Sequence, residues 1–454
     1  MGDAKWYRFE SEMIEPDTIY AVSSGSGMAG IAVVRMSGSH AGAVLSALSD
    51  LLPPARHASV RQLRSPVTKA IIDQALVLWL PGPSTVTGED VAEFHVHGSA
   101  AVIDALFSAF KTFSSVRLAE PGEFTRRAFI NGRIDLVEAE GLADLLLAGS
   151  EAQHALAMGH MLGRASSIYE SWRSKMLEIA AHLEAAIDFA DEDGVAEVAL
   201  QHVRTETTSL IKILEDAVQQ SERAGLVRNG IKVVIGGPPN VGKSSLLNAI
   251  SAREAAIVSS RPGTTRDVIE VRIVLEGVPV ILTDTAGLRP DTGDEIENIG
   301  MERARSEIVG GDIRIWVTAA DVESDMKPPA LPDIHVFNKL DLVNEKSIHI
   351  RNENQIGIST KTAEGLEPLL QELRRKIGNR AGGQELAVVV RTRHKTAVEE
   401  SIRYLNESLT HDFGHVELAA ECLRKACQSM ARITGRVDVE DLLGKIFSEF
   451  CIGK

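Results

Sequence analysis

Cysteine is scarce in this sequence, and long apolar runs are missing from it. Three cysteines in 454 residues are too few for a framework of disulfide bonds. No apolar run reaches the roughly 18 residues that a membrane-spanning helix needs. The first residues also lack the apolar core of a secretory signal peptide. We therefore expect a cytoplasmic protein without stable membrane insertion.

Basic residues are in deficit as well, since the formal net charge is −15 at pH 7. A protein whose whole surface wraps nucleic acid needs clustered lysine and arginine to neutralise phosphates. The charge balance argues against that class and leaves room only for a local basic patch. The 44% hydrophobic and 24% charged content is typical of a globular protein, and the length predicts roughly three domains.

Residues 237–244 read Gly-Pro-Pro-Asn-Val-Gly-Lys-Ser, between a strand-like run at 231–235 and an amphipathic stretch that begins at Ser245. In this context the glycines let backbone N–H groups curl around phosphate oxygens, and the helix N-terminus adds partial positive charge. Lys243 supplies a charge for the β- and γ-phosphates, and the Ser244 hydroxyl can ligate Mg²⁺. The alternative is a glycine turn that merely begins a helix.

Three later motifs favour the phosphate-binding interpretation. Asp284-Thr-Ala-Gly287 follows the apolar run 278–282, where its carboxylate can reach a metal ion. Asn338-Lys-Leu-Asp341 follows the run 334–337, and Asp341 can accept two N–H donors from a guanine edge. Ser359-Thr-Lys361 is a weaker match to the loop that closes over the base. Four signals in order predict a GTPase module.

Hydrolysis needs a positioned water and positive charge near the phosphates. Leu288 occupies the position of the Ras-like glutamine and supplies neither, so another residue must orient the water. The acidic cluster 294–297 either does so or stabilises the N-terminus of a helix that starts near residue 298. Thr265 is the better candidate to close over Mg²⁺, with Thr264 beside it. The amide of Asn240 can hold a monovalent cation, whereas Arg266 and Arg289 are either arginine fingers or solvent-facing.

The residues before this module predict a compact α+β unit with strands at 17–22, 31–36 and 74–80 and helical spacing at 40–52. The run 91–97 alternates strictly, so Ala92, Phe94 and Val96 face one side and Glu93, His95 and His97 the other. A transition-metal site, a polar small-molecule pocket and a solvated face all remain open for the polar side.

Helical patterns flank the GTPase module on both sides, at 136–145 and 197–224 before it and at 392–450 after it. We interpret them as one bundle into which the module is inserted; the alternative is two unrelated helical segments. One predicted apolar stripe consists of Met176, Leu177, Ala180, Leu183, Ala186 and Ile187. Cys422 and Cys427 lie five residues apart in a helical pattern, where buried thiols are favoured over metal ligands.

Several motifs then combine across the chain: Asp17-Thr-Ile, Arg35-Met-Ser-Gly38, Gly88-Glu-Asp-Val91, His97-Gly98, Pro121-Gly-Glu-Phe124, Asn240-Val-Gly-Lys-Ser-Ser245, Gly263-Thr-Thr-Arg-Asp267, Asp284-Thr-Ala-Gly-Leu-Arg289 and Cys451-Ile-Gly-Lys454. Along nearly its whole length the chain resembles the MnmE (TrmE) tRNA-modifying GTPases. The resemblance implies a multidomain α/β and α+β fold, in which a Ras-like P-loop GTPase is inserted into a helical bundle. The implied division is a folate-binding and dimerisation domain (1–134), a helical domain in two parts (135–227 and 382–454) and the GTPase domain (228–381).

The resemblance also implies site residues. Folate contacts fall on Arg35, Glu93, Arg133 and Lys454, and the catalytic glutamate corresponds to Glu297. Mg²⁺ contacts fall on Ser244 and Thr265. The K⁺ contacts are Asn240, Ser259, Arg261 through its backbone carbonyl, and Thr264. The full nucleotide-binding set is Asn240, Val241, Gly242, Lys243, Ser244, Ser245, Ser259, Thr264, Thr265, Asp284, Thr285, Ala286, Gly287, Asn338, Lys339, Asp341, Ser359, Thr360 and Lys361.

Cys451 has more than one interpretation. Cys-Ile-Gly-Lys is a poor prenylation signal, because glycine and lysine replace the usual residues. A buried cysteine at a helix end would be ordinary. In the family this terminus points towards the folate pocket, where Lys454 and Arg35 can favour a reactive thiolate. The choice between a nucleophile and an inert thiol stays open.

The function implied by the resemblance is that of a K⁺-activated, Mg²⁺-dependent homodimeric GTPase working with an MnmG-type flavoprotein. Such a pair uses a 5-formyl- or methylene-tetrahydrofolate unit to add an aminomethyl-type group at carbon five of the wobble uridine of certain tRNAs. The alternative is a regulatory GTPase in ribosome assembly or signalling without modification chemistry. The C-terminal segment contains Glu440, Asp441 and Glu449 and lacks a G-x-x-G RNA loop, which favours the enzyme.

Overall fold

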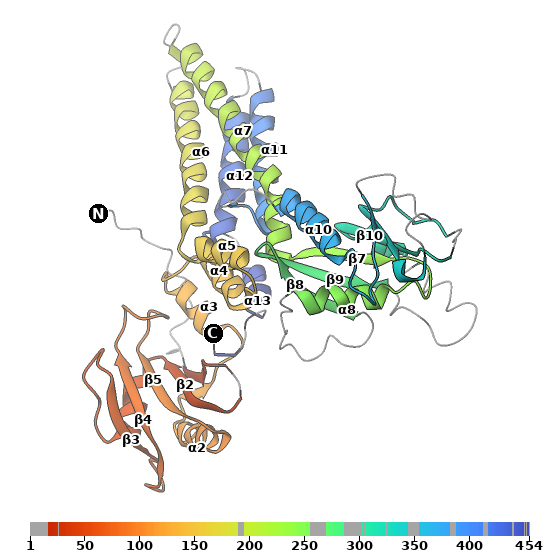
Figure 1. Ribbon diagram of the computed structural model, residues 1–454. Helices are drawn as coiled ribbons and strands as arrows, with labels where there is room; N and C mark the ends of the chain where they lie inside the picture. Colours follow the sequence, from red (N-terminus) through yellow and green to blue (C-terminus); the bar gives the residue numbers. More distant parts are fainter. Residues whose placement is uncertain are drawn as a thin grey trace. The chain divides into compact units, whose positions relative to one another are not determined.

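The computed structural model describes residues 17–25, 27–188, 195–254, 269–285, 302, 305–322, 326–343, 354–381, 387–411, 416–437, 440–448, 450 and 452–453. The chain forms two compact units (Figure 1). The first joins Met1–Ala143 to Ala431–Lys454, and the second runs from Asp144 to Met430. No helix in these ranges is both long and apolar enough to cross a membrane.

The first unit is built on a six-stranded sheet in the order β3-β4-β5-β2-β1-β6. Its neighbouring strands are antiparallel, except that β1 and β6 are parallel. Apolar residues alternate along β2 and β5, so one face of the sheet is buried beneath α1 and α2. The elements are β1 (Thr18–Val22), β2 (Ala29–Ser37), α1 (Ala41–Ser49), β3 (Ser59–Arg64), β4 (Ile71–Leu80), β5 (Val91–Gly98), α2 (Ala100–Phe110), β6 (Val116–Leu118), α3 (Glu123–Ile130), α4 (Leu136–Leu147) and α13 (Glu440–Ser448).

The opposite face of this sheet carries the polar residues of the alternation. Because Ala92, Phe94 and Val96 are buried in the core beneath the helices, Glu93 and His95 face the other side, as predicted. There α3 packs against β1 through a small cluster that includes Ile19 and Phe124. The polar face is therefore partly covered, which creates a sheltered setting for charged side chains.

The end of the chain returns to the first unit. Ile452 forms an isolated antiparallel bridge with Pro121, and the Ser23 hydroxyl donates to the Gly453 carbonyl at 2.9 Å. Gly453 has φ +98°, and a Cβ there would lie 2.1 Å from the Val22 carbonyl oxygen. Only glycine fits this turn without strain.

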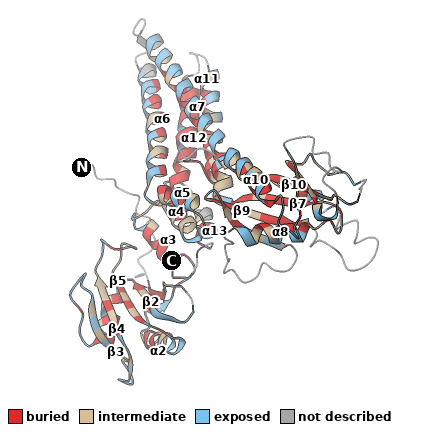
Figure 2. Cartoon of the chain, viewed as in Figure 1, coloured by how far each residue is buried: buried red, intermediate tan, exposed pale blue. Residues whose placement is uncertain are grey.

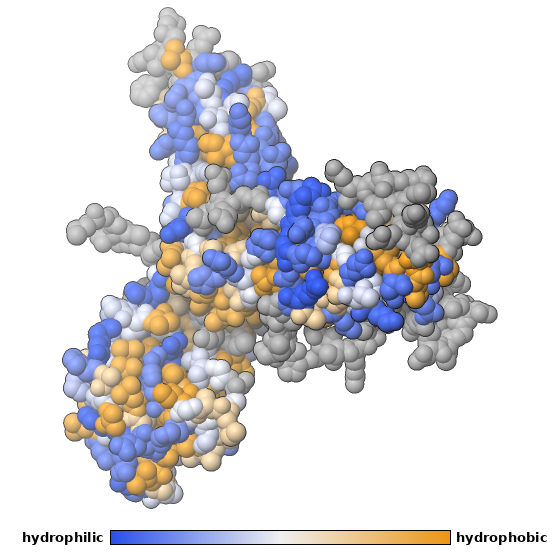
Figure 3. All heavy atoms as spheres, in the orientation of Figure 1, coloured by the Kyte–Doolittle hydropathy of each residue, from blue (hydrophilic) through white to orange (hydrophobic). Residues whose placement is uncertain are grey.

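The second unit contains another six-stranded sheet, in the order β12-β11-β10-β7-β9-β8. All neighbours are parallel except the antiparallel pair β8 and β9. α8 and α10 pack on one face, and in Figure 3 hydrophilic residues gather over the outer side of α10. The elements are β7 (Ile231–Gly236), α8 (Lys243–Arg253), β8 (Ile269–Leu275), β9 (Val278–Asp284), β10 (Ile313–Ala319), β11 (Ile334–Asn338), η2 (Leu340–Leu342), β12 (Gln355–Gly357) and α10 (Leu366–Ala381).

Helices from both sides of this sheet module form one bundle, which confirms the predicted insertion. α7 packs against α6 on one side and α11 on the other. Asp144 joins both halves, because it accepts from Arg228 at 3.0 Å and from Arg391 at 2.9 Å. The bundle helices are α5 (Glu151–Met161), α6 (Arg164–Asp188), α7 (Val195–Asn229), α11 (Thr392–Thr410) and α12 (Val416–Thr434).

Among the side chains of α6 that the structure describes, the buried stripe differs from the predicted one at Leu177, whereas the predicted side chains of Ala186 and Ile187 lie outside the described part. Met176, Ala180 and Leu183 are buried, but Leu177 is 44% exposed and Ile179 is buried instead. Figure 2 shows both buried and exposed residues along α6. Residues 176, 179, 180 and 183 follow the three- and four-residue spacing of a helix face, whereas position 177 lies about 100° round from 176. The inclusion of Leu177 in the stripe was therefore wrong.

Candidate functional site

The phosphate loop follows β7 directly and runs into α8, as the sequence predicts. Gly237 (φ +148°) and Gly242 (φ +96°) have backbone conformations that L side chains rarely adopt. A Cβ on Gly237 would lie 2.1 Å from the Val317 carbonyl oxygen, and one on Gly242 would lie 2.3 Å from Asn338 Nδ2. Asn240 also has a positive φ, of 61°, which asparagine tolerates better than most residues. The glycines are thus required both by the turn and by close neighbours.

Lys243 is the first residue of α8, and its side chain is folded back over the loop. Its Nζ donates to the carbonyl oxygens of Gly237 at 2.8 Å and Pro238 at 2.7 Å. The residue is buried, so the ammonium group is held by backbone oxygens in a sheltered position. A phosphate that enters the loop meets this charge together with the N–H groups of the helix N-terminus.

Ser244 and Asp284 meet at the centre of the site. The Ser244 hydroxyl donates to Asp284 Oδ2 at 2.5 Å. Asp284 is buried at the end of β9 and lies opposite Ile235 of β7 in the parallel register. A hydroxyl and a carboxylate are oxygen donors of the kind that Mg²⁺ takes when it also binds phosphates, so these two residues fit that ion.

The candidate base-binding loops are tied to the phosphate loop. Asn338 is buried at the end of β11, donates from Nδ2 to the Val241 carbonyl at 2.8 Å and accepts from Thr360 N–H at 3.2 Å. Asp341 lies in η2 and accepts from the Ser359 hydroxyl at 2.7 Å. These bonds join three predicted motifs, far apart in the sequence, in one site.

The remaining predicted nucleotide contacts divide into two groups. Thr285 lies beside the loop, where its hydroxyl donates to the Ile235 carbonyl at 3.1 Å. Ser245 is the third residue of α8, Lys339 has φ 68°, and Lys361 lies exposed in the loop after Ser359. Outside the described residues lie Ser259, Arg261, Thr264, Thr265, Arg266, Ala286, Gly287, Leu288, Arg289 and Glu297, together with Cys451 and Lys454.

A second candidate site lies on the polar face of the first sheet. Arg35 and Glu93 are direct partners in the β2–β5 register and form an ion pair at 2.9 Å. His95 Nε2 lies 3.4 Å from the other oxygen of Glu93. Arg133 lies on the turn after α3, next to Gly88. A partly covered guanidinium–carboxylate pair with an adjacent imidazole can bind a planar, polar small molecule through several hydrogen bonds.

His97 does not join Glu93 and His95, so the three side chains form no shared metal site. Its Nδ1 lies 2.8 Å from Asp73 Oδ1 on the neighbouring β4, and its backbone N–H donates to Asp73 Oδ2. Burial acts to raise the pKa of Asp73, but these hydrogen bonds prevail and the pKa is lowered. The structure thus rules out the transition-metal site that the alternation of this strand left open for Glu93, His95 and His97.

A buried ionic network beside this site was not predicted from the sequence. Glu123, at the start of α3, accepts from Arg117 at 2.7 Å and from Arg127 at 2.9 Å. Arg127 also reaches Glu89 at 3.1 Å, and Glu89 accepts from Ser37 at 2.7 Å. Burial acts to raise the pKa of Glu123, but the two guanidinium groups and a backbone N–H outweigh it and hold the pKa at about 2. The only sequence signal was the density of charge between residues 117 and 133.

Comparison with known proteins gives matches along nearly the whole chain. The profile of the MnmE helical domain matches residues 136–451, and that of the GTP-binding protein TrmE N-terminus matches residues 18–133. The tRNA modification GTPase MnmE of Rhodopseudomonas palustris is 43% identical over 96% of this chain and 99% of its own length. The protein of the same name from Phenylobacterium zucineum is 44% identical over 96% of this chain and 100% of its own.

Among solved structures, the G domain of the T. maritima FeoB iron transporter is 25% identical. It covers 33% of this chain and 98% of its own, with a TM-score of 0.23. This is only a weak overall likeness. The GTPase fold therefore rests on the strands and loops described above and on the full-length relatives.

Proposed function

The chain belongs to the MnmE family of tRNA modification GTPases and is a GTP hydrolase, and from that premise we propose the details of its activity. Its GTPase is activated by K⁺ and uses Mg²⁺, and hydrolysis drives a conformational change. With an MnmG-type flavoprotein, the homodimer adds an aminomethyl-type group at carbon five of the wobble uridine of certain tRNAs. A tetrahydrofolate derivative supplies the one-carbon unit, and the reaction takes place in the cytoplasm.

The observation that carries the GTPase part is the junction of Ser244 with Asp284 at 2.5 Å, beside the folded-back Lys243. When GTP binds, the loop N–H groups and Lys243 hold the phosphates, and Asp341 accepts from the guanine edge. Ser244, with Thr265, would hold Mg²⁺, which would neutralise negative charge on the phosphates. In this proposal Glu297 orients the attacking water, because Leu288 cannot.

Asn240 is the residue on which the proposed K⁺ activation rests. It is exposed in the phosphate loop, and an amide oxygen at this position can hold a monovalent cation beside the phosphates. The cation would supply the charge that an arginine finger supplies in other GTPases. The other proposed contacts are Ser259, the Arg261 carbonyl and Thr264.

The attachment of the GTPase to the bundle supports the coupling of hydrolysis to movement. α7 ends at Asn229 and β7 begins at Ile231, so a single residue, Gly230, joins a bundle helix to the strand that enters the phosphate loop. Gln153 of α5 also donates to the Arg228 carbonyl at 2.8 Å. A nucleotide-dependent shift of the loop would therefore act directly on bundle helices.

The GTPase proposal is tested by steady-state GTP hydrolysis in KCl and in NaCl at equal ionic strength. We expect strong stimulation by K⁺ in the wild type and in Asn406→Ala, a control on the exposed face of α11. Stimulation should be lost in Asn240→Ala. Equal rates in both salts would overturn the cation role of Asn240 and redirect attention to Arg266 and Arg289.

The folate proposal rests on Arg35, Glu93, Arg133 and Lys454. Binding of 5-formyltetrahydrofolate to the full-length protein should weaken in Arg35→Gln and Glu93→Gln. Binding should persist in Arg61→Gln, a control on β3 at the far side of the sheet order. Unchanged binding in both site variants would overturn the assignment without touching the GTPase.

The modification chemistry needs its own readout. Mass spectrometry of nucleosides from tRNA incubated with the protein, its flavoprotein partner, GTP and the folate should reveal the modified uridine. Replacement of GTP by a non-hydrolysable analogue should abolish it. Modification without any dependence on GTP hydrolysis would contradict the proposed coupling.

A further inference from the structure

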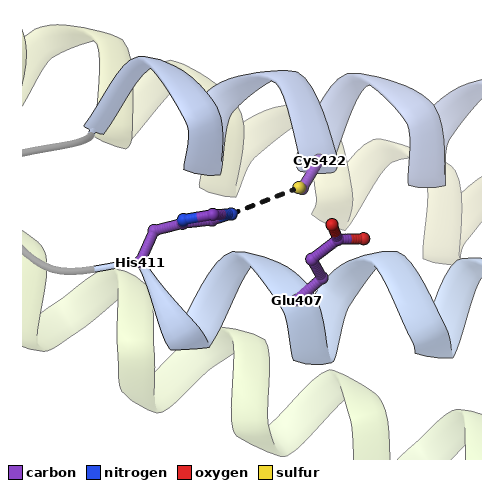
Figure 4. Close-up of side chains that lie close together, drawn as sticks. All are labelled: Glu407, His411 and Cys422. Atoms are coloured by element: carbon purple, nitrogen blue, oxygen red, sulfur yellow. Dashed lines mark hydrogen bonds between the residues drawn. The ribbon is translucent and has the colours of Figure 1, made fainter.

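Three potential metal ligands meet at the end of the hairpin formed by α11 and α12. Glu407 and His411 come from the last turn and the C-cap of α11, four residues apart, so both project on the same side. Cys422 comes from the second turn of α12 and faces them (Figure 4). The three side chains point toward one another in the space between the two helices.

The distances suit a small ion. Cys422 Sγ lies 3.9 Å from His411 Nε2, and one donor atom from each residue lies within 4.8 Å of the others. In a tetrahedral zinc site with a Zn–S bond near 2.3 Å and a Zn–N bond near 2.0 Å, sulfur and nitrogen are separated by roughly 3.6 Å. Contraction by a few tenths of an ångström would bring the sulfur and the nitrogen to this separation, and the Glu407 side chain is exposed and can turn toward the same ion. Cys422 is buried, His411 is half-buried and Glu407 is exposed, which leaves an entry path for an ion.

The donor set selects a class of metal. A thiolate combined with an imidazole and a carboxylate suits borderline divalent ions such as Zn²⁺, and disfavours Mg²⁺ and Ca²⁺, which take oxygen ligands. Metal sites in helical bundles are commonly built in this way, from side chains on facing helices. The set is therefore chemically separate from the oxygen ligands of the phosphate loop.

An independent feature adjoins the cluster. A cavity of about 30 Å³ shares His411 as a lining residue and is also lined by Thr207 and Ser408. Thr207 is fully buried, and its hydroxyl has no hydrogen-bond partner among the described residues. A cavity of this size can hold a water molecule, with which the buried Thr207 hydroxyl can form a hydrogen bond.

We propose that Glu407, His411 and Cys422 form a site for a zinc-class divalent ion that clips the end of α11 to α12. The ion is held by one sulfur, one nitrogen and one carboxylate oxygen, with water completing the coordination. Such a clip stabilises the bundle of the second unit at the end of the hairpin. It lies outside the GTPase module and is independent of the proposed function.

The protonation state of the thiol gives the binding a signature. Burial, and then the negative charges of Glu407 and Glu421, raise the pKa of Cys422, whereas Lys425 opposes them. The metal-free thiol is therefore protonated near neutral pH and forms a weak hydrogen bond with His411. Coordination deprotonates it, so one proton is released to the solvent when the ion binds.

The test is a titration of the tag-free, full-length protein with Co²⁺, a spectroscopic stand-in for Zn²⁺. Excess Mg²⁺ and GDP fill the phosphate-loop site, which in any case has no sulfur ligand. We expect one equivalent of Co²⁺ to produce a thiolate-to-cobalt charge-transfer band and tetrahedral visible bands, which Zn²⁺ then displaces. Absence of a sulfur band at stoichiometric Co²⁺ would mean that the contact is only a thiol–imidazole hydrogen bond.

Variants assign the band to these residues. Cys422→Ser should abolish it, and His411→Ala and Glu407→Gln should each weaken binding more than about tenfold. Cys427→Ser, which removes the next buried thiol of α12, and Glu399→Gln on the exposed face of α11 are the matched controls. A band that survives in Cys422→Ser would place the ion on another cysteine and overturn the proposal. The wild type and Cys427→Ser decide the question even if a ligand variant folds poorly.

Discussion

The two candidate sites of this protein are built in different ways. In the second unit, the phosphate site gathers loops from the carboxyl ends of β7, β9 and β11, which meet at one edge because the strands are parallel. In the first unit, Arg35 and Glu93 lie mid-strand on antiparallel neighbours, where only the register places one opposite the other. Contiguous sequence motifs therefore define the phosphate site, whereas strand pairing defines the Arg35–Glu93 site.

Their electrostatics differ as well. The phosphate loop uses backbone groups and one lysine that rests on carbonyl oxygens. The sheet of the first unit is supported by a buried network in which Glu123 receives two guanidinium groups. A buried ionic network depends on each partner, because the loss of one leaves an uncompensated charge on the other. Because the two sites lie in separate compact units, we expect a substitution in one unit to affect only the site of that unit.

The largest expected effect is on GTP turnover. Lys243→Ala should lower kcat/KM for GTP by about 10²–10³-fold, because the charge facing the transferred phosphate is lost. Lys232→Ala on β7, whose side chain pairs with Glu307 at 2.8 Å, is the control and should change it little. Folate binding should be unaffected by either change. A loss of less than tenfold in Lys243→Ala would show that the backbone alone holds the phosphates.

The second largest expected effect is on the specificity for the guanine base. Asp341→Asn should weaken GTP binding by about 10²-fold, since charge-assisted hydrogen bonds to guanine are replaced by weaker or mismatched ones. Binding of xanthosine triphosphate should improve, because the new amide N–H can donate to the carbonyl that replaces the guanine amino group. Titrations with both nucleotides measure the switch, with Asp321→Asn in the exposed turn after β10 as the control. Unaltered discrimination would remove Asp341 from base recognition.

In the first unit, Glu123→Gln should lower the free energy of local unfolding by about 2 kcal/mol at pH 7, because the buried guanidinium group of Arg127 and the partly exposed one of Arg117 lose their charged partner. The pKa of Glu123 is lowered to about 2 from 4.5. This contribution is therefore fully present above pH 4.5 and is lost as the pH falls toward 2. Hydrogen exchange of the β1 and β6 amides at pH 7 and at pH 3 measures this stabilisation. The difference in stability between the wild type and Glu123→Gln should be smaller at pH 3 than at pH 7.

The control for that experiment is Glu178→Gln, an exposed partner of Lys175 on α6. It should change stability by less than about 0.5 kcal/mol, as is usual for exposed pairs. GTP hydrolysis should remain normal in Glu123→Gln. Loss of GTP hydrolysis in Glu123→Gln would contradict the expectation that substitutions in the first unit leave the second unit unaffected.

The smallest expected effect concerns His97, which is 70% exposed. His97→Ala should destabilise the first unit by less than about 1 kcal/mol, because the backbone N–H of residue 97 continues to donate to Asp73. Folate binding should not change, since His97 points away from the Arg35–Glu93 pair toward Asp73. Loss of binding would return His97 to the site. Hydrogen exchange and a folate titration on the same sample distinguish the outcomes.

Local sequence determined much of the nucleotide site. The strand before Gly237, the turn that requires glycine and the helix that begins at Lys243 are each encoded within a few residues, and the structure confirms them. The alternation along β5 likewise assigns Phe94 to the core and Glu93 to the polar face. Hydrophobic periodicity and turn chemistry act over short distances, so a single sequence suffices to predict them. The roles of Glu297 and Cys451 stay predictions.

Only the tertiary structure decided which distant residues meet. The pairing of His97 with Asp73 depends on strand register, and the network around Glu123 depends on how α3 packs on β1. Position 177 on α6 was misassigned because a helix stripe is set by the neighbouring helices and not by hydrophobicity alone. Cys422 could be predicted as a buried thiol, yet its approach to His411 and Glu407 follows from the crossing of two helices. Long-range packing has no local signal, because it depends on the free energy of the whole fold.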